Sequence, residues 1–256
     1  ADGDIQFLQW GNSGGLPVIV LAPVDVRDCV MLTMQAFNLA ERFRCPVFVA
    51  TNKEIAMTRE TIDLEALDLP TVETRLLADP DAPFRPFAGS TTAPVPGFLP
   101  IGGDRLVRQT SSTHGPDGYI TTDPDQIAAN QDRLMRKILS ARDAFTDYDS
   151  EEAPGARTLV ISYGVTARAV RDAVARLNAS GSPTSLLILK TLWPVPETLL
   201  RAKAEAYERI VVIEMNLGQY LREIQRVLAP RQIVFYGQMN GELIRPEKIQ
   251  EAVAHG

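Results

Sequence analysis

Short runs of consecutive apolar residues alternate with helical patterns in the C-terminal half of the chain. Uninterrupted apolar runs are typical of strands covered on both faces, and apolar residues at every third or fourth position are typical of helices. The predicted strands are 158–163, 185–189, 209–214 and 232–236, and the predicted helices are 165–177, 196–207, 219–228 and 246–254. Helices of about ten residues between strands imply right-handed crossovers. Residues 155–256 are therefore predicted to form an α/β domain with a parallel sheet.

A smaller unit of the same kind lies near the N-terminus. Predicted strands at 17–22 and 46–50 flank a helix that ends near Phe43, with Asp25 as its N-cap and Asp28 in its first turn. One strand–helix–strand unit leaves the edges of its sheet uncovered. We therefore expect residues 1–63 to be the end of a larger α/β domain, the sequence to be a fragment, and upstream sequence or a partner to complete the sheet.

The middle of the chain, residues 64–154, has a different composition. Nine of the 18 prolines lie between Pro70 and Pro124, and proline disfavours both helices and central strands. An irregular loop of this length usually covers a functional site or wraps over a partner. A helix is predicted from Pro124 to about Thr146, followed by an acidic linker over residues 147–155.

Three motifs in the C-terminal half give a specific resemblance: YGVTARA (163–169), KTLWPVP (190–196) and EMNLGQ (214–219). They resemble the C-terminal domain of the α subunit of 2-oxoacid:ferredoxin oxidoreductases, most closely the 2-oxoglutarate type. That domain is similar to the C-terminal domain of transketolase. Upstream, WGNSGG (10–15), LAP (21–23) and AFNLAE (36–41) resemble the end of the same subunit's pyrimidine-binding domain. The resemblance covers nearly the whole chain and is weakest over residues 64–111.

The resemblance implies an oxidoreductase that decarboxylates a 2-oxoacid, with coenzyme A taking the acyl group and ferredoxin the electrons. It implies thiamine diphosphate, Mg²⁺ and a [4Fe-4S] cluster in the assembled complex, held largely by a β subunit. The family's Tyr-Pro-Ile-Thr-Pro segment and activating glutamate are not in this chain. No catalytic, cofactor-binding or metal-binding residue is therefore carried over, and the chain is expected to act only in a hetero-oligomer with the β subunit.

Five residues are candidates for subunit or ligand contact: Asn52, Arg59, His114, Asn216 and Gly218. Asn52 and Asn216 follow predicted strands, where open α/β sheets bind ligands. The resembling family often has an acidic residue at position 52, so this sequence departs from the family there and no charge-dependent role is carried over to Asn52. Asn216 as a helix cap with Gly218 in a close turn is the simpler interpretation. An exposed ion pair with its neighbour is the simpler interpretation for Arg59, and an uncommitted loop side chain is the simpler one for His114.

Composition narrows the possible locations and partners. A net charge of −6 argues against nucleic acid, and no apolar run reaches the roughly 20 residues of a membrane helix. Two cysteines, Cys29 and Cys45, fit a reduced cytoplasmic protein, and without a Cys-x-x-Cys motif no iron–sulfur cluster is expected on this chain alone.

Two other functions are left open by the sequence. One is a segment of a different thiamine enzyme, of transketolase or 1-deoxyxylulose-phosphate synthase type. The other is a stand-alone α/β module for interaction or nucleotide binding. Reduction of viologen with 2-oxoglutarate and coenzyme A, sugar-phosphate turnover without iron, and a stable nucleotide-binding monomer distinguish the three hypotheses.

Overall fold

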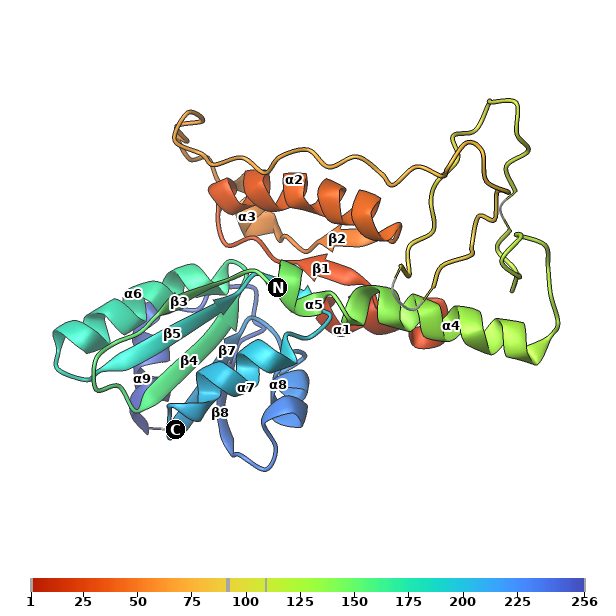
Figure 1. Cartoon of the computed structure of the whole chain (residues 1–256). Helices are drawn as coiled ribbons and strands as arrows, with labels where there is room; N and C mark the ends of the chain where they lie inside the picture. Colours follow the sequence, from red (N-terminus) through yellow and green to blue (C-terminus); the bar gives the residue numbers. More distant parts are fainter. Residues whose placement is uncertain (1, 91–92, 109, 256) are drawn as a thin grey trace.

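The computed structural model describes residues 2–90, 93–108 and 110–255, and its larger sheet lies in the C-terminal half (Figure 1). This sheet has five strands in the order β3-β5-β4-β7-β8. The strands are β3 (Tyr148–Glu151), β4 (Thr158–Tyr163), β5 (Thr184–Leu189), β7 (Arg209–Glu214) and β8 (Ile233–Gly237). Four of them are parallel, and β3 is antiparallel to β5. The predicted α/β class is confirmed, but the sheet is mixed rather than purely parallel.

Helices cover both faces of this sheet, which explains the uninterrupted apolar runs. The helices are α6 (Thr166–Ala179), α7 (Glu197–Glu205), α8 (Leu221–Leu228) and α9 (Pro246–His255). Successive residues of a strand point to opposite faces. Leu159 and Ile161 accordingly pack with side chains of α7 and α8, whereas Val160 packs with side chains of α6 and α9. The predicted helices and strands of this half are confirmed to within about two residues at their ends.

The prediction of an acidic linker is wrong for residues 148–151, because they form β3. Tyr148 pairs with Leu189 and Glu151 with Leu186 at the edge of the sheet. An edge strand tolerates polar side chains that a central strand does not, so residues 148–151 contain no apolar run. The long helix predicted after Pro124 is also divided. It forms α4 (Pro124–Leu139) and α5 (Arg142–Phe145), with the hydroxyl of Ser140 donating to the carbonyl of Arg136 at 2.7 Å.

A second sheet of three strands joins the two halves of the chain. Its order is β2 (Val47–Val49), β1 (Ile19–Leu21) and β6 (Thr191–Trp193). The C-terminal half contributes β6, which runs antiparallel to β1 directly after β5. One edge of the N-terminal unit is thus completed by this chain itself, which corrects the expectation that only outside sequence would do so. Among the described residues, β2 pairs with β1 alone.

The N-terminal unit packs through α2 (Val26–Phe43), which begins at the predicted cap. The carboxylate of Asp25 accepts a hydrogen bond from the backbone N–H of Asp28 at 2.8 Å. The apolar face of α2 buries Leu32, Leu39 and Phe43 against β1 and against Ile138 of α4. The short helices α1 (Ile5–Trp10), a 3-10 turn (Ser13–Gly15) and α3 (Lys53–Met57) complete this part.

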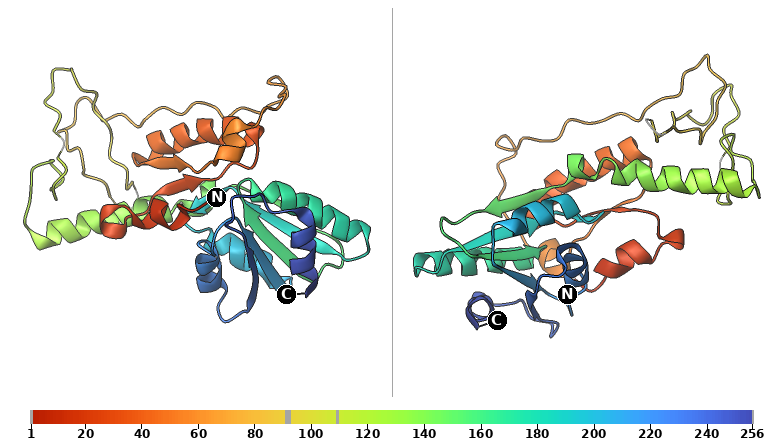
Figure 2. Two further views of the ribbon diagram at one scale, coloured as in Figure 1. Left: turned by 180° about the vertical axis from the view of Figure 1, so that it is seen from behind. Right: turned by 60° about the horizontal axis from the view of Figure 1, so that its bottom comes forward.

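No helix or strand is assigned to the described residues between Met57 and Pro124. They form the predicted irregular excursion, which runs along α2, forms loops beyond the end of that helix and returns to the start of α4 (Figure 2). Arginine side chains bind its carbonyl groups; Arg44, for example, donates to Pro96 O at 3.0 Å. None of the helices in the described part of the chain is long and apolar enough to cross a membrane.

Candidate functional site

A cavity of about 380 Å³ lies where β1, β2 and β4 end at their carboxyl termini. In open α/β sheets, ligands bind outside the carboxyl ends of the strands. Its walls come from α1, from the residues after β2, and from the turn after β4. The lining residues are Asp2, Gly3, Asp4, Ile5, Leu8, Ala22, Val49, Ala50, Thr51, Asn52, Lys53, Ile55, Tyr163 and Gly164.

Asn52, one of the predicted residues, lines this cavity and holds a buried carboxylate. Its side-chain oxygen caps α3 by accepting from the N–H of Ile55 at 3.0 Å. Its amide nitrogen donates to Asp2 Oδ1 at 3.1 Å. The other oxygen, Asp2 Oδ2, is buried and has no hydrogen-bond partner among the described residues. Burial raises the pKa of Asp2. The cavity therefore offers one unused acceptor, or a donor when Asp2 is protonated.

Beside the cavity, the buried carboxylate of Glu214 organises the turn between β7 and α8. It is 1% exposed. Glu214 Oε2 accepts from the hydroxyl of Tyr163 at 2.9 Å and from the N–H of Tyr220 at 3.0 Å. Glu214 Oε1 accepts at 2.6 Å from the N–H of Leu221, the first residue of α8. Burial raises the pKa of Glu214, while these hydrogen bonds oppose the increase. Glu214 thus caps α8.

Asn216 and Gly218 belong to the same turn. The side-chain oxygen of Asn216 accepts from the N–H groups of Gly218 and Gln219, both at 2.8 Å. Its amide nitrogen donates to Tyr163 Oη at 2.8 Å and to the Asp2 carbonyl at 3.0 Å. The predicted close turn at Gly218 is present with φ of +81°. The helix starts at Leu221, later than predicted, so Asn216 orders the turn and the cap comes from Glu214 instead.

The structure brings Asn52 and Asn216 together around Asp2, with Gly218 in the turn that Asn216 orders, but leaves the other two candidates outside. Arg59 is exposed and has no ion pair among the described residues, because its neighbour Glu60 pairs with Arg168 at 3.0 Å. His114 lies in the excursion, with its ring centroid 3.8 Å from that of Phe87.

The chemistry of the cavity is that of a small, acidic, half-apolar site. Burial raises the pKa of Tyr163 well above its usual range, so its hydroxyl stays protonated. Lys53 is the one cation among the described lining residues, and the two carboxylates of Asp2 and Asp4 outnumber it. This lining is a poor match for a diphosphate, which needs several cationic or N–H donors. Within the described residues, no group of three or more His, Cys, Asp or Glu side chains could hold a metal ion.

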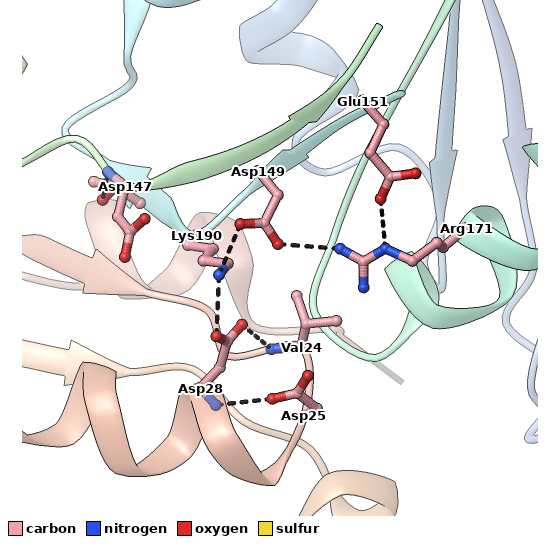
Figure 3. A network of polar contacts seen from close by, with 9 residues as sticks. Val24, Asp25, Asp28, Asp147, Asp149, Glu151, Arg171 and Lys190 are labelled. Atoms are coloured by element: carbon pink, nitrogen blue, oxygen red, sulfur yellow. Dashed lines mark hydrogen bonds and ion pairs between the residues drawn. The ribbon is translucent and has the colours of Figure 1, made fainter. Parts of the chain in front are cut away.

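An ionic network fixes the junction between the two sheets (Figure 3). Lys190, between β5 and β6, places its Nζ 3.0 Å from Asp28 Oδ1 on α2 and 3.0 Å from Asp149 Oδ1 on β3. Arg171 of α6 binds Asp149 and Glu151. Lys190 and Asp28 are mostly buried, with side-chain exposures of 13% and 11%. The network therefore fixes the approach of α2 to the C-terminal sheet.

Sequence reasoning missed Glu214 and Lys190, although a signal was present. Each is a single charge at the end of an apolar strand, in RIVVIE (209–214) and SLLILK (185–190). A charge buried with a strand needs partners, so such positions indicate a polar cluster. Asp2 carried no signal, because its burial depends on Asn52 and Asn216 from distant segments.

Comparison with known proteins covers both halves of the chain. Residues 1–132 match the family "Pyruvate flavodoxin/ferredoxin oxidoreductase, thiamine diP-bdg", and residues 156–249 match "Pyruvate:ferredoxin oxidoreductase core domain II". The 2-oxoglutarate synthase subunit KorA of Methanothermobacter thermautotrophicus is 35% identical, over 97% of this chain and 66% of that protein. The same subunit of Methanocaldococcus jannaschii is 31% identical, over 99% of this chain and 68% of that protein.

More distant relatives and a solved structure follow the same pattern. The ketoisovalerate oxidoreductase subunit VorB of M. thermautotrophicus is 26% identical over 97% of this chain and 63% of that protein. The 2-oxoglutarate:ferredoxin oxidoreductase from Magnetococcus marinus, solved with 2-oxoglutarate, coenzyme A and succinyl-CoA bound, superposes with a TM-score of 0.89 at 25% identity. That match covers 98% of this chain and 44% of the solved chain. The chain spans about two thirds of the length of these curated relatives. It belongs to the thiamine diphosphate-binding pyruvate flavodoxin/ferredoxin oxidoreductase family.

Proposed function

We propose that the chain is part of the α subunit of a 2-oxoglutarate:ferredoxin oxidoreductase, which converts the 2-oxoacid and coenzyme A to an acyl-CoA. The observation that carries this proposal is the gradient of identity among relatives. Those named 2-oxoglutarate synthase subunits share 29–35% of residues over nearly the whole chain, whereas ketoisovalerate subunits share 26%. This gradient supports 2-oxoglutarate rather than a branched 2-oxoacid as the substrate.

The share of this chain in the reaction is a framework. Residues 1–63 end the pyrimidine-binding domain, 64–154 form the excursion and linking helix, and 155–256 form the transketolase-like C-terminal domain. Thiamine diphosphate supplies the electron sink for decarboxylation. Because the acidic cavity has a single lysine beside two carboxylates among its described lining residues, we assign the cofactor, Mg²⁺ and a [4Fe-4S] cluster largely to a β subunit. Ferredoxin takes the electrons, and the complex is cytoplasmic.

Exposed apolar side chains support a partner on the α1 side of the molecule. Phe7 and Trp10 lie one turn apart on α1 and are 69% and 59% exposed. Leu217, in the turn before α8, is 75% exposed. The two segments adjoin, because the N–H of Gln6 donates to Gln219 Oε1 at 3.0 Å. Large apolar side chains that share a surface mark interaction sites, so we propose that the β subunit covers them.

The test is reduction of methyl viologen by the purified α–β complex. We expect reduction that requires both 2-oxoglutarate and coenzyme A, with 2-oxoisovalerate a poorer substrate. Turnover of sugar phosphates by an iron-free preparation would support the transketolase-type alternative instead. A monomer that is stable alone, and whose Tm rises with nucleotide, would support the stand-alone module.

A further inference from the structure

A second cavity, of about 480 Å³, lies between the excursion and α4 and shares no lining residue with the acidic cavity in the described structure. Cavities of roughly 300–1,000 Å³ are typical of small-molecule sites. Three arginines line it: Arg85 from the excursion, and Arg133 and Arg136 from α4. The rings of Phe87 and His114, in contact at an angle of 41°, form part of its wall. It is therefore basic and partly aromatic, unlike the acidic cavity.

Arg133 is the central feature of this cavity. It is 7% exposed, yet it has no ion pair among the described residues. Its Nη1 donates to Pro94 O at 2.9 Å and its Nη2 to Asn130 Oδ1 at 2.6 Å, both neutral acceptors. Its Nε is buried and unpartnered in the described structure. A buried guanidinium with a free donor and no counter-charge is costly, which indicates an anion that comes from outside.

The surroundings of Arg133 add positive charge rather than cancel it. Arg44 and Lys137 lie close enough to repel it, and neither has a carboxylate partner in the described structure. Cys45 does not supply the missing charge, because burial raises the pKa of its thiol to about 11. Of the cations that line the cavity, only Arg136 has an acidic partner within the described parts of the chain, Asp132, at 2.6 Å.

No acidic side chain is among the described residues that line the cavity. The carboxylates of Asp117 and Asp123 accept from the N–H groups of Tyr119 at 3.0 Å and Asp125 at 2.9 Å, and neither forms an ion pair within the described residues. Arg85 is exposed and has no ion pair in the described part of the chain. Arg44, Arg133, Lys137 and Arg85 thus leave several positive charges uncompensated. A single carboxylate would balance one of them, whereas a phosphate group carries about −1.5 to −2 at pH 7 and a diphosphate carries more.

We propose that this cavity binds a small molecule that carries phosphate groups, with Arg85, Arg133 and Arg136 as its anion-binding side chains. Guanidinium groups bind phosphate oxygens through paired hydrogen bonds. The wall of Phe87 and His114 suits a ring system attached to the phosphate, as in a nucleotide. The site does not depend on the proposed 2-oxoacid chemistry, and a binding assay separates the two.

The test is isothermal titration calorimetry of pyrophosphate, ADP and coenzyme A into the purified protein at low salt, with sulfate as the control anion. We expect one site that binds at least one of the three probes more tightly than sulfate and weakens as salt increases. Tighter binding of coenzyme A than of ADP supports the acyl acceptor of the proposed reaction as the source. Equal binding supports a nucleotide effector.

Arg85→Ala is the sharpest variant, because the Arg85 side chain is exposed and forms no hydrogen bond or ion pair within the described residues, so we expect its loss to leave folding intact. Its affinity should fall by about tenfold or more with an unchanged Tm. Arg201→Ala, an exposed arginine on α7 without an ion pair in the described residues, makes the same charge change and should bind as the parent does. Three results would overturn the proposal. The first is that none of the three probes binds more tightly than sulfate, and the second is that the Arg85→Ala and Arg201→Ala variants bind with equal affinity. The third is binding of polyglutamate that pyrophosphate does not displace.

Discussion

Replacing Glu214 with alanine should destabilise the C-terminal sheet more than any surface change. The substitution leaves three donors without an acceptor: the buried Tyr163 hydroxyl, the buried N–H of Tyr220 and the half-buried N–H of Leu221. Each unsatisfied buried donor costs about 1–3 kcal/mol. Removing the buried charge returns part of that cost, so we expect a loss of about 3–6 kcal/mol in the free energy of unfolding. Glu214→Gln keeps one oxygen and should lose about 1–3 kcal/mol.

Urea unfolding followed by circular dichroism measures these losses. Glu208→Gln is the matched control, because Glu208 is 63% exposed and its ion pair with Arg157 is on the surface. We expect this control to stay within about 0.5 kcal/mol of the parent protein. A Glu214→Ala protein within about 1 kcal/mol of the parent would refute the reasoning, since three unsatisfied donors cannot cost so little.

The parent protein and the Glu214→Gln variant also give a pH test. Burial raises the pKa of Glu214 above its usual 4.5, so the folded state holds this proton more tightly than the unfolded state. Its contribution to stability is therefore complete below pH 4.5 and is lost as the pH rises through the folded pKa. The stability advantage of the parent over Glu214→Gln should shrink across that range. An advantage that grows with pH would show that the carboxylate, rather than the acid, is favoured by folding.

Three further predictions concern other parts of the structure. Lys190→Met leaves its two carboxylate partners facing each other and should cost about 3 kcal/mol by urea unfolding, with the exposed Lys248→Met near zero. A smaller loss than that of the control would refute the role of the junction network. Gly218→Ala should cost about 1–2 kcal/mol because its φ is +81°, whereas Gly103→Ala, in open space, should be neutral; equal effects would contradict this. With a pKa of about 11, Cys45 should react with a thiol reagent at pH 8 about 100-fold more slowly than a free cysteine, as mapped by mass spectrometry. Labelling at the free-cysteine rate would show that its thiol is accessible and ionised.

Much of the C-terminal fold follows from local pattern. Strands such as 209–214 are apolar throughout because helices cover both faces, and this signal needs no knowledge of distant residues. The edge strand at 148–151 and the three-residue strand at 191–193 could not be predicted in the same way. The edge strand is mostly polar and the other strand has only three residues. Both depend on pairing with strands that lie elsewhere in the chain.

The candidate site was predictable only in part. Asn52 and Asn216 could be placed at carboxyl ends of strands, because strand order within a parallel sheet sets that position. That they meet through Asp2 is a tertiary fact, since position 2 lies 214 residues from position 216. The uncompensated charge around Arg133 was equally invisible, because burial and missing counter-ions depend on how the proline-rich excursion folds over α4.

Calorimetric titration of thiamine diphosphate with Mg²⁺ into this chain alone, and into its mixture with the β subunit, addresses the central claim. If the chain is a framework, the cofactor should bind at micromolar concentration only when the β subunit is present. Micromolar binding of thiamine diphosphate by these 256 residues alone would contradict the account.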